Sequence, residues 1–199
     1  MEKQKTNKAE EPVSGYDGPY TYEDYLKFDF DYMVELIRGF IYKMSPAPTT
    51  IHQKVAGNFH IIFGNHFKKH KCQLFIAPTD VVLPVYNTKR KQSNTVVQPD
   101  IVIVCDQSKI TEKAIIGVPD FILEVISPHT SKKDIKYKYA VYEECGVREY
   151  WIVYPMDKLV EVLLLVDGQY VRKELYTREE TATLCTFPGV KVDLKEVFE

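Results

Sequence analysis

Two carboxylates stand in apolar stretches where a plain β-strand has no need of an acid. Asp100 follows Pro99 at the start of Ile-Val-Ile-Val, and Glu124 interrupts the apolar run over residues 121–126. The neighbours of Glu124 would cover both faces of a strand, where an unpaired carboxylate is costly. Two such acids at the ends of adjacent strands could share one hard divalent cation, because Mg²⁺ takes oxygen ligands. Alternatively, Asp100 bonds nearby backbone amides at a strand start, and Glu124 lies at a sheet edge or in an ion pair.

Lys138 is the cation best placed to meet these acids. At about 100° per residue, Asp134, Lys138 and Tyr142 share one sector of the helix expected over 131–145, whereas Lys136 points the opposite way. Lys138 is therefore expected to face the core. The alternative is an Asp134/Lys138 pair at the edge of the apolar stripe, with the ammonium reaching water.

Hydrophobic periodicity predicts the elements that hold these residues. A short helix opens after Thr21, a hairpin turns at Arg38-Gly39, and an amphipathic helix capped by Thr50 carries apolar residues from Ile51 to Phe67. Strand-like runs follow over 74–85, 95–104 and 119–127. After them come the helix 131–145, which stops at Gly146, a strand over 147–155 and a hairpin across Asp167-Gly168. The core order is αβββαβ.

Composition favours one α/β domain. The chain has 199 residues, and 45% of them are apolar, enough for a sizeable core. Its net charge is −2, so the composition does not indicate a broad basic surface. We expect a disordered tail over 1–19 and a single domain over 20–199. The sequence shows no signal segment or membrane span, which predicts a soluble, cytoplasmic protein. The cysteines are far apart and without C-x-x-C spacing, so we expect reduced, buried thiols at Cys72, Cys105, Cys145 and Cys185.

The segments Gln-Pro-Asp-Ile-Val-Ile-Val (98–104) and 121–155 resemble the Uma-two family of restriction-endonuclease-like proteins, a branch of the PD-(D/E)XK nuclease superfamily. The segment 34–53 is similar to the amino-terminal signature of that family, and the resemblance spans about 21–190. It implies a restriction endonuclease-like α/β fold, with a mixed central sheet flanked by helices and with β-hairpins at both ends of the chain.

The resemblance also implies roles for individual residues. Pro99-Asp100 matches the PD element and Glu124 the second acid, but Ile126 occupies the position where the superfamily places a lysine. In the family the basic role moves to the next helix, whose residues match Asp134, Lys138 and Tyr142. The positions of Glu35, Asp80 and His52 are also typical of the family, although His52 could equally bond locally at a helix start.

The function implied is metal-dependent hydrolysis of DNA. Asp100, Glu124 and the Val125 carbonyl would hold Mg²⁺ or Mn²⁺, Lys138 would orient water or stabilise charge, and Glu35 would position water or a second ion. Duplex DNA is the expected substrate and a homodimer the expected assembly. Phosphate contacts could come from the basic clusters at 68–71, 89–91 and 132–133.

Two other functions are compatible with the same residues. A catalytically inactive nuclease-fold module could bind nucleic acid or a protein partner, with its carboxylates paired structurally to Lys138. A metal-dependent hydrolase of another ester is the third possibility. Phosphate-binding glycine loops, G-x-S-x-G and H-E-x-x-H are missing from the sequence, which disfavours nucleotide-triphosphate, serine-hydrolase and zincin chemistry.

Overall fold

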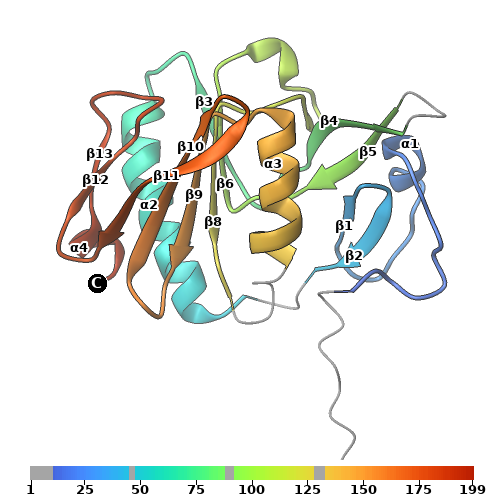
Figure 1. The fold of residues 1–199 in the computed structure, drawn as a ribbon, viewed down its shortest axis with the longest axis horizontal. Helices are drawn as coiled ribbons and strands as arrows, with labels where there is room; N and C mark the ends of the chain where they lie inside the picture. Colours follow the sequence, from blue (N-terminus) through green and yellow to red (C-terminus); the bar gives the residue numbers. More distant parts are fainter. Residues whose placement is uncertain (1–10, 45–47, 88–91, 128–132) are drawn as a thin grey trace, which may run out of the picture.

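A computed structural model of the chain describes residues 11–44, 48–87, 92–127 and 133–199 (Figure 1). The helical elements in these ranges are α1 (Tyr22–Tyr25), α2 (Thr50–Phe67), the 3-10 turn η1 (Gln107–Lys109), the π-helical η2 (Lys133–Lys138), α3 (Tyr139–Cys145) and α4 (Leu194–Val197). The strands are β1 (Val34–Ile37), β2 (Phe40–Lys43), β3 (Gln73–Ile76), β4 (Val81–Asn87), β5 (Gln92–Val97), β6 (Ile101–Val104), β7 (Ile115–Ile116), β8 (Phe121–Val125), β9 (Glu149–Tyr154), β10 (Leu159–Val166), β11 (Gln169–Thr177), β12 (Thr181–Thr183) and β13 (Lys191–Asp193).

The central sheet has the strand order β11-β10-β9-β8-β6-β3. It is mixed, because β6 and β8 are antiparallel whereas β8 and β9 are parallel. Taken along the chain, α2, β3, β6, β8, α3 and β9 form the αβββαβ core that the sequence predicts. The hairpin of β10 and β11 extends one edge of this sheet.

A smaller sheet has the order β2-β1-β5-β4-β7 and was not expected as a separate unit. The runs 74–85 and 95–104, each predicted as one strand, are both divided between the two sheets. The breaks fall at Pro78 and Pro99, because proline has no N–H to donate to a strand ladder. Each proline therefore marks a crossing from one sheet to the other.

The two faces of the central sheet are covered differently (Figure 1). On one face α2 packs Phe59 and Phe63 against Phe121 and Trp151. On the other face lie α3 and one side of the smaller sheet, in a second buried cluster that includes Tyr142. Aromatic residues between 20 and 32 cover the outer side of the smaller sheet.

The hairpin between β1 and β2 turns at Arg38-Gly39, as predicted. Both residues have positive φ, 52° and 85°, and a Cβ on Gly39 would lie 2.6 Å from the Pro19 side chain. The tail expected over 1–19 divides: residues 1–10 lie outside the described ranges. In the remainder, the Val13 N–H donates to the Ile41 carbonyl at 2.7 Å, so this segment follows β2.

The helix ends mostly follow the sequence signals. Thr21 and Asp24 form the expected capping box of α1, and Gly146 ends α3 with φ 87°. The cap of α2 is Thr49, not Thr50 as predicted, because the Thr49 side chain accepts the His52 N–H. No helix in the described ranges is both long and apolar enough to cross a membrane.

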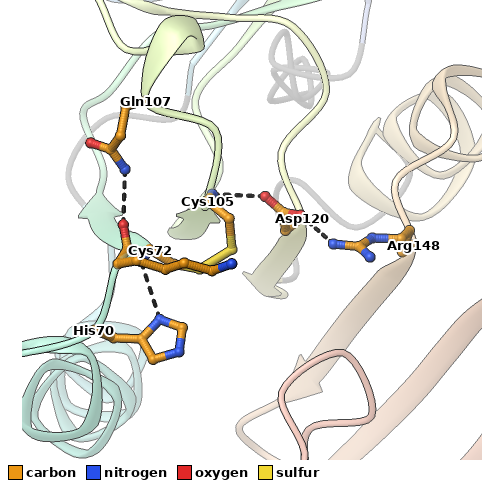
Figure 2. The surroundings of a disulfide bond; sticks show 7 residues. His70, Cys72, Cys105, Gln107, Asp120 and Arg148 are labelled. Atoms are coloured by element: carbon orange, nitrogen blue, oxygen red, sulfur yellow. Dashed lines mark hydrogen bonds and ion pairs between the residues drawn. A yellow bond between two sulfur atoms is a disulfide. The ribbon is translucent and has the colours of Figure 1, made fainter.

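A disulfide joins Cys72 to Cys105 (Figure 2), so the prediction of reduced thiols is wrong for this pair. Cys72 precedes β3 and Cys105 follows β6, and the pairing of Gln73 with Val104 places the two cysteines opposite each other. Spacing along the chain could not reveal this, because strand pairing brings together residues that are 33 positions apart. Cys145 is half-buried and Cys185 is exposed; both are free thiols, as expected, but the expected burial is wrong for Cys185.

Candidate active site

The pairing of β6 with β8 brings Asp100 and Glu124 to the same end of neighbouring strands. Ile101 lies opposite Leu123 in this ladder, which places Asp100 opposite Glu124 just before β6 begins. The Val125 N–H has no strand residue to pair with there and donates instead to Asp100 Oδ2 at 2.7 Å. The two acids therefore lie at the same end of neighbouring strands, as the sequence analysis expected.

Glu124 is only 4% exposed and lies on the side of the central sheet that α3 covers. Its Oε1 accepts hydrogen bonds from the Lys138 Nζ at 2.9 Å and from the Tyr142 hydroxyl at 2.8 Å. Burial raises the pKa of Tyr142 well above the ordinary tyrosine value, and the Glu124 charge raises this pKa further. Tyr142 therefore stays neutral and remains a donor to Glu124.

Lys138 occupies the junction of η2 and α3 and is 3% exposed. Its Nζ lies 2.8 Å from Glu35 Oε1 as well as 2.9 Å from Glu124 Oε1. The predicted inward direction of Lys138 is confirmed. The alternative, in which the Lys138 ammonium reaches water from the edge of the apolar stripe, is wrong because Lys138 is buried. Asp134 belongs to η2, but its side chain lies outside the described residues.

His52 and Asp100 connect α2 to the same region. The His52 Nε2 lies 3.3 Å from Asp100 Oδ2, and His52 is buried in the first turn of α2. Asp100 Oδ2 therefore faces both the His52 ring and the Val125 N–H. The local hydrogen bond at this helix start comes from the main chain of His52, which leaves its ring directed at Asp100.

Asp80 lies just before β4 and belongs to a hydrogen-bonded group that the sequence analysis did not identify. Asp80 Oδ1 accepts from the Gln98 Nε2 at 2.7 Å and from the Tyr25 hydroxyl at 3.1 Å. The Gln98 main-chain N–H donates to Glu35 Oε1 at 2.9 Å. For Gln98, the available signal was its position directly before Pro99-Asp100; nothing in the sequence pointed to Tyr25.

The sequence that builds this site matches a known protein family. The sequence matches the family model of Uma2, described as "Putative restriction endonuclease", over residues 21–195. The chain belongs to the Uma2 family. No curated protein matches the chain.

The fold is similar to that of a solved structure, titled as a "putative nuclease belonging to DUF820" from Anabaena variabilis ATCC 29413. The TM-score is 0.71 at 19% identity, and the similarity covers 90% of this chain and 98% of that chain. A likeness at this identity concerns the fold, and it supports the nuclease-like α/β architecture.

Ile126 stands where the PD-(D/E)XK pattern that the sequence resembles has a lysine, and it is buried and packs in the cluster with Tyr142. An apolar residue fits this position, since the side chain points into the core. The ammonium reaches Glu124 from α3 instead, through Lys138. With Ile126 at that position, a lysine still lies beside Glu124.

The donor set suits a hard cation better than a soft one. The described residues contain no group of three or more His, Cys, Asp or Glu side chains arranged to hold a metal. Two carboxylates with a carbonyl would suffice for Mg²⁺, which usually keeps several waters. In a strand the N–H and C=O of one residue point to the same side, so the Val125 carbonyl faces the side on which Asp100 lies. Asp100, Glu124 and the Val125 carbonyl are oxygen donors, the ligand type that Mg²⁺ and Mn²⁺ prefer.

Proposed function

We propose that the protein is a metal-dependent endodeoxyribonuclease that hydrolyses phosphodiester bonds of duplex DNA. The observation that carries the proposal is the contact of the Lys138 ammonium with Glu124, at the strand end where Asp100 lies. Membership of the Uma2 family supports the same reaction class. Phosphodiester hydrolysis needs an activated water and neutralisation of charge on phosphorus, and these groups can supply both.

Asp100, Glu124 and the Val125 carbonyl would hold the cation. When bound, Mg²⁺ or Mn²⁺ would neutralise phosphate charge and lower the pKa of a bound water. His52 orients Asp100 and Tyr142 orients Glu124, each through the contact described above.

Lys138 would orient the attacking water or stabilise the charge that develops on the phosphate. Glu35 fixes Lys138 from the smaller sheet, because its Oε1 lies 2.8 Å from the ammonium. This contact draws the ammonium toward a position between two acids and limits its rotation. A lysine held in this way needs no reorganisation during the reaction.

Basic side chains indicate where the DNA backbone would lie on the protein. Lys68, Lys69 and Lys71 are exposed at the carboxyl end of α2. From His52 to Lys68 the helix rises roughly 24 Å, so this cluster would contact phosphates well away from the cleaved bond. The cluster at 89–91 and Lys132 lie outside the described residues. Cutting both strands of a duplex with one site per chain favours a homodimer with twofold symmetry.

The proposal is tested by incubating the protein with supercoiled plasmid in Mg²⁺, in Mn²⁺ and in EDTA. Cleavage is expected with either metal and not in EDTA, and Asp100→Asn should lower the cleavage rate by about a hundredfold or more. Asp106→Asn is the matched control, because Asp106 is exposed and only caps η1. Metal-dependent cutting that survives in Asp100→Asn would refute the assignment.

The alternative is a catalytically inactive module of the same fold. It is favoured by one observation: Lys138 already contacts two carboxylates, as in a structural ion-pair network. Calorimetric titration separates the two functions. An inactive module would show no Mn²⁺ binding that depends on Asp100 and Glu124, whereas the proposed nuclease would.

A further inference from the structure

Gln98 lies at the crossing from β5 to β6, where the chain passes from the smaller sheet to the central one. Its main-chain N–H and its side chain hold two different acids. The N–H donates to Glu35 Oε1 at 2.9 Å and the side-chain amide donates to Asp80 Oδ1 at 2.7 Å. Pro99 and Asp100 follow directly, so one three-residue segment holds Glu35 and Asp80 through Gln98 and contributes the acid Asp100.

The orientation of the Gln98 side chain is determined by its partner. An ionised carboxylate only accepts hydrogen bonds, so the Nε2 must face Asp80 and the Oε1 must point elsewhere. Gln98 is 9% exposed, and its Oε1 is a buried acceptor for which the described residues supply no donor. A buried acceptor left unsatisfied is unfavourable, and a water bound to a cation would satisfy it.

Tyr25 holds Asp80 from the other side. Its hydroxyl donates to the same Oδ1 at 3.1 Å, and burial followed by the Asp80 charge raises the pKa of Tyr25. The hydroxyl therefore keeps its proton. Asp80 Oδ1 is fixed by two donors, one from α1 and one from Gln98, and the direction of its charge is determined by both.

We propose that Gln98 is a positioning residue: it aligns Glu35 and Asp80, and so determines how strongly the acidic site attracts its divalent cation. This inference rests on the proposed function, because it assumes that a divalent cation binds at Asp100 and Glu124. Glu35 reaches that site through Lys138, which contacts Glu124 as well. Removing a group that lies outside the direct ligands commonly changes metal affinity by ten- to a hundredfold.

The test compares Gln98→Met with Thr95→Val. Gln98→Met preserves side-chain length and the main-chain N–H but removes the amide that holds Asp80. Thr95 is a buried residue of β5 whose hydroxyl accepts the Arg38 N–H and donates to Asn94 Oδ1, so Thr95→Val removes two side-chain hydrogen bonds, neither of them to an acid. Both variants should lose similar stability. Mn²⁺ affinity, measured by calorimetry without DNA, should fall about tenfold in Gln98→Met alone.

The Mn²⁺ affinities of the two variants and of the unmodified protein decide the role of Gln98. Equal Mn²⁺ affinity in Gln98→Met and Thr95→Val would overturn the positioning role, and so would the absence of Mn²⁺ binding to the unmodified protein. If Mn²⁺ binds but plasmid DNA is not cut, the proposed function fails. The affinity difference between the two variants still decides the role of Gln98 in that case.

Discussion

Lys138 contacts carboxylates from two different sheets. The sequence predicted its direction but not both of its partners. Its inward direction follows from helical periodicity, because a lysine in the same sector as Val141 and Tyr142 must face the core. The partner Glu35 was reached only through family resemblance. Gln98 and Tyr25 were missed, since an amide and a phenol have no distinctive pattern until the fold brings them to Asp80.

Glu149 gives a prediction at the residue scale. This carboxylate is fully buried and accepts hydrogen bonds from the Trp151 indole, at 2.8 Å, and from the main-chain N–H groups of Cys185 and Thr186, at 3.0 and 2.6 Å. Glu149→Gln would place an amide donor against donors and should destabilise the protein by about 1–3 kcal/mol. Urea unfolding followed by fluorescence of Trp151, the single tryptophan, measures the effect.

Glu174→Gln is the control for this measurement, because Glu174 lies exposed on β11 and should be replaceable with little change. Equal unfolding midpoints for the two variants would mean that Glu149 does not hold the segment at 185–186 in place.

At the scale of elements, periodicity identified α2, the αβββαβ order and both hairpins. It could not separate β3 from β4 or β5 from β6, because apolar residues continue across each break. Pro78 and Pro99 were visible in the sequence, but a proline allows either a strand edge or a crossing between sheets. The separation is functionally important, since Gln98, Pro99 and Asp100 lie on one such crossing.

The disulfide gives a prediction for β3, which is an edge strand of the central sheet. The Cys72–Cys105 bond closes a loop of 33 residues, and such a link stabilises a protein by about 3–4 kcal/mol through loss of entropy in the unfolded chain. Reduction, or Cys105→Ser, should therefore lower the melting temperature measured by calorimetry. Cys185→Ser should leave it unchanged because Cys185 is a free, exposed thiol. A melting curve insensitive to reductant would contradict this.

At the scale of the whole molecule, the site lies where three layers meet. The amino-terminal end of α2 supplies His52, the central sheet supplies Asp100 and Glu124, and the layer of α3 and the smaller sheet supplies Lys138 and Glu35. The sequence predicted the fold class because composition and element order determine layers. How the smaller sheet packs depends on contacts between residues far apart in the chain.

Buried tyrosines give a prediction for the molecule as a whole. Burial is the main cause that raises the pKa of Tyr142 and Tyr170, and it raises the pKa of Tyr154 to about 12. An unfolded tyrosine ionises near pH 10, so the stabilisation is present below that pH and is lost as the pH rises. Circular dichroism and tyrosinate absorbance should therefore change together above about pH 10. Complete tyrosine ionisation with the fold intact would contradict the buried assignment.

The most direct test of the central claim compares Lys138→Met with Lys136→Met. Both lysines belong to η2, but Lys136 is exposed and Lys138 contacts Glu35 and Glu124. With Mn²⁺ and supercoiled plasmid, the cleavage rate should fall by about a hundredfold or more in Lys138→Met and stay unchanged in Lys136→Met, with both proteins shown to be folded by circular dichroism. Equal cleavage by the two folded variants would contradict the account.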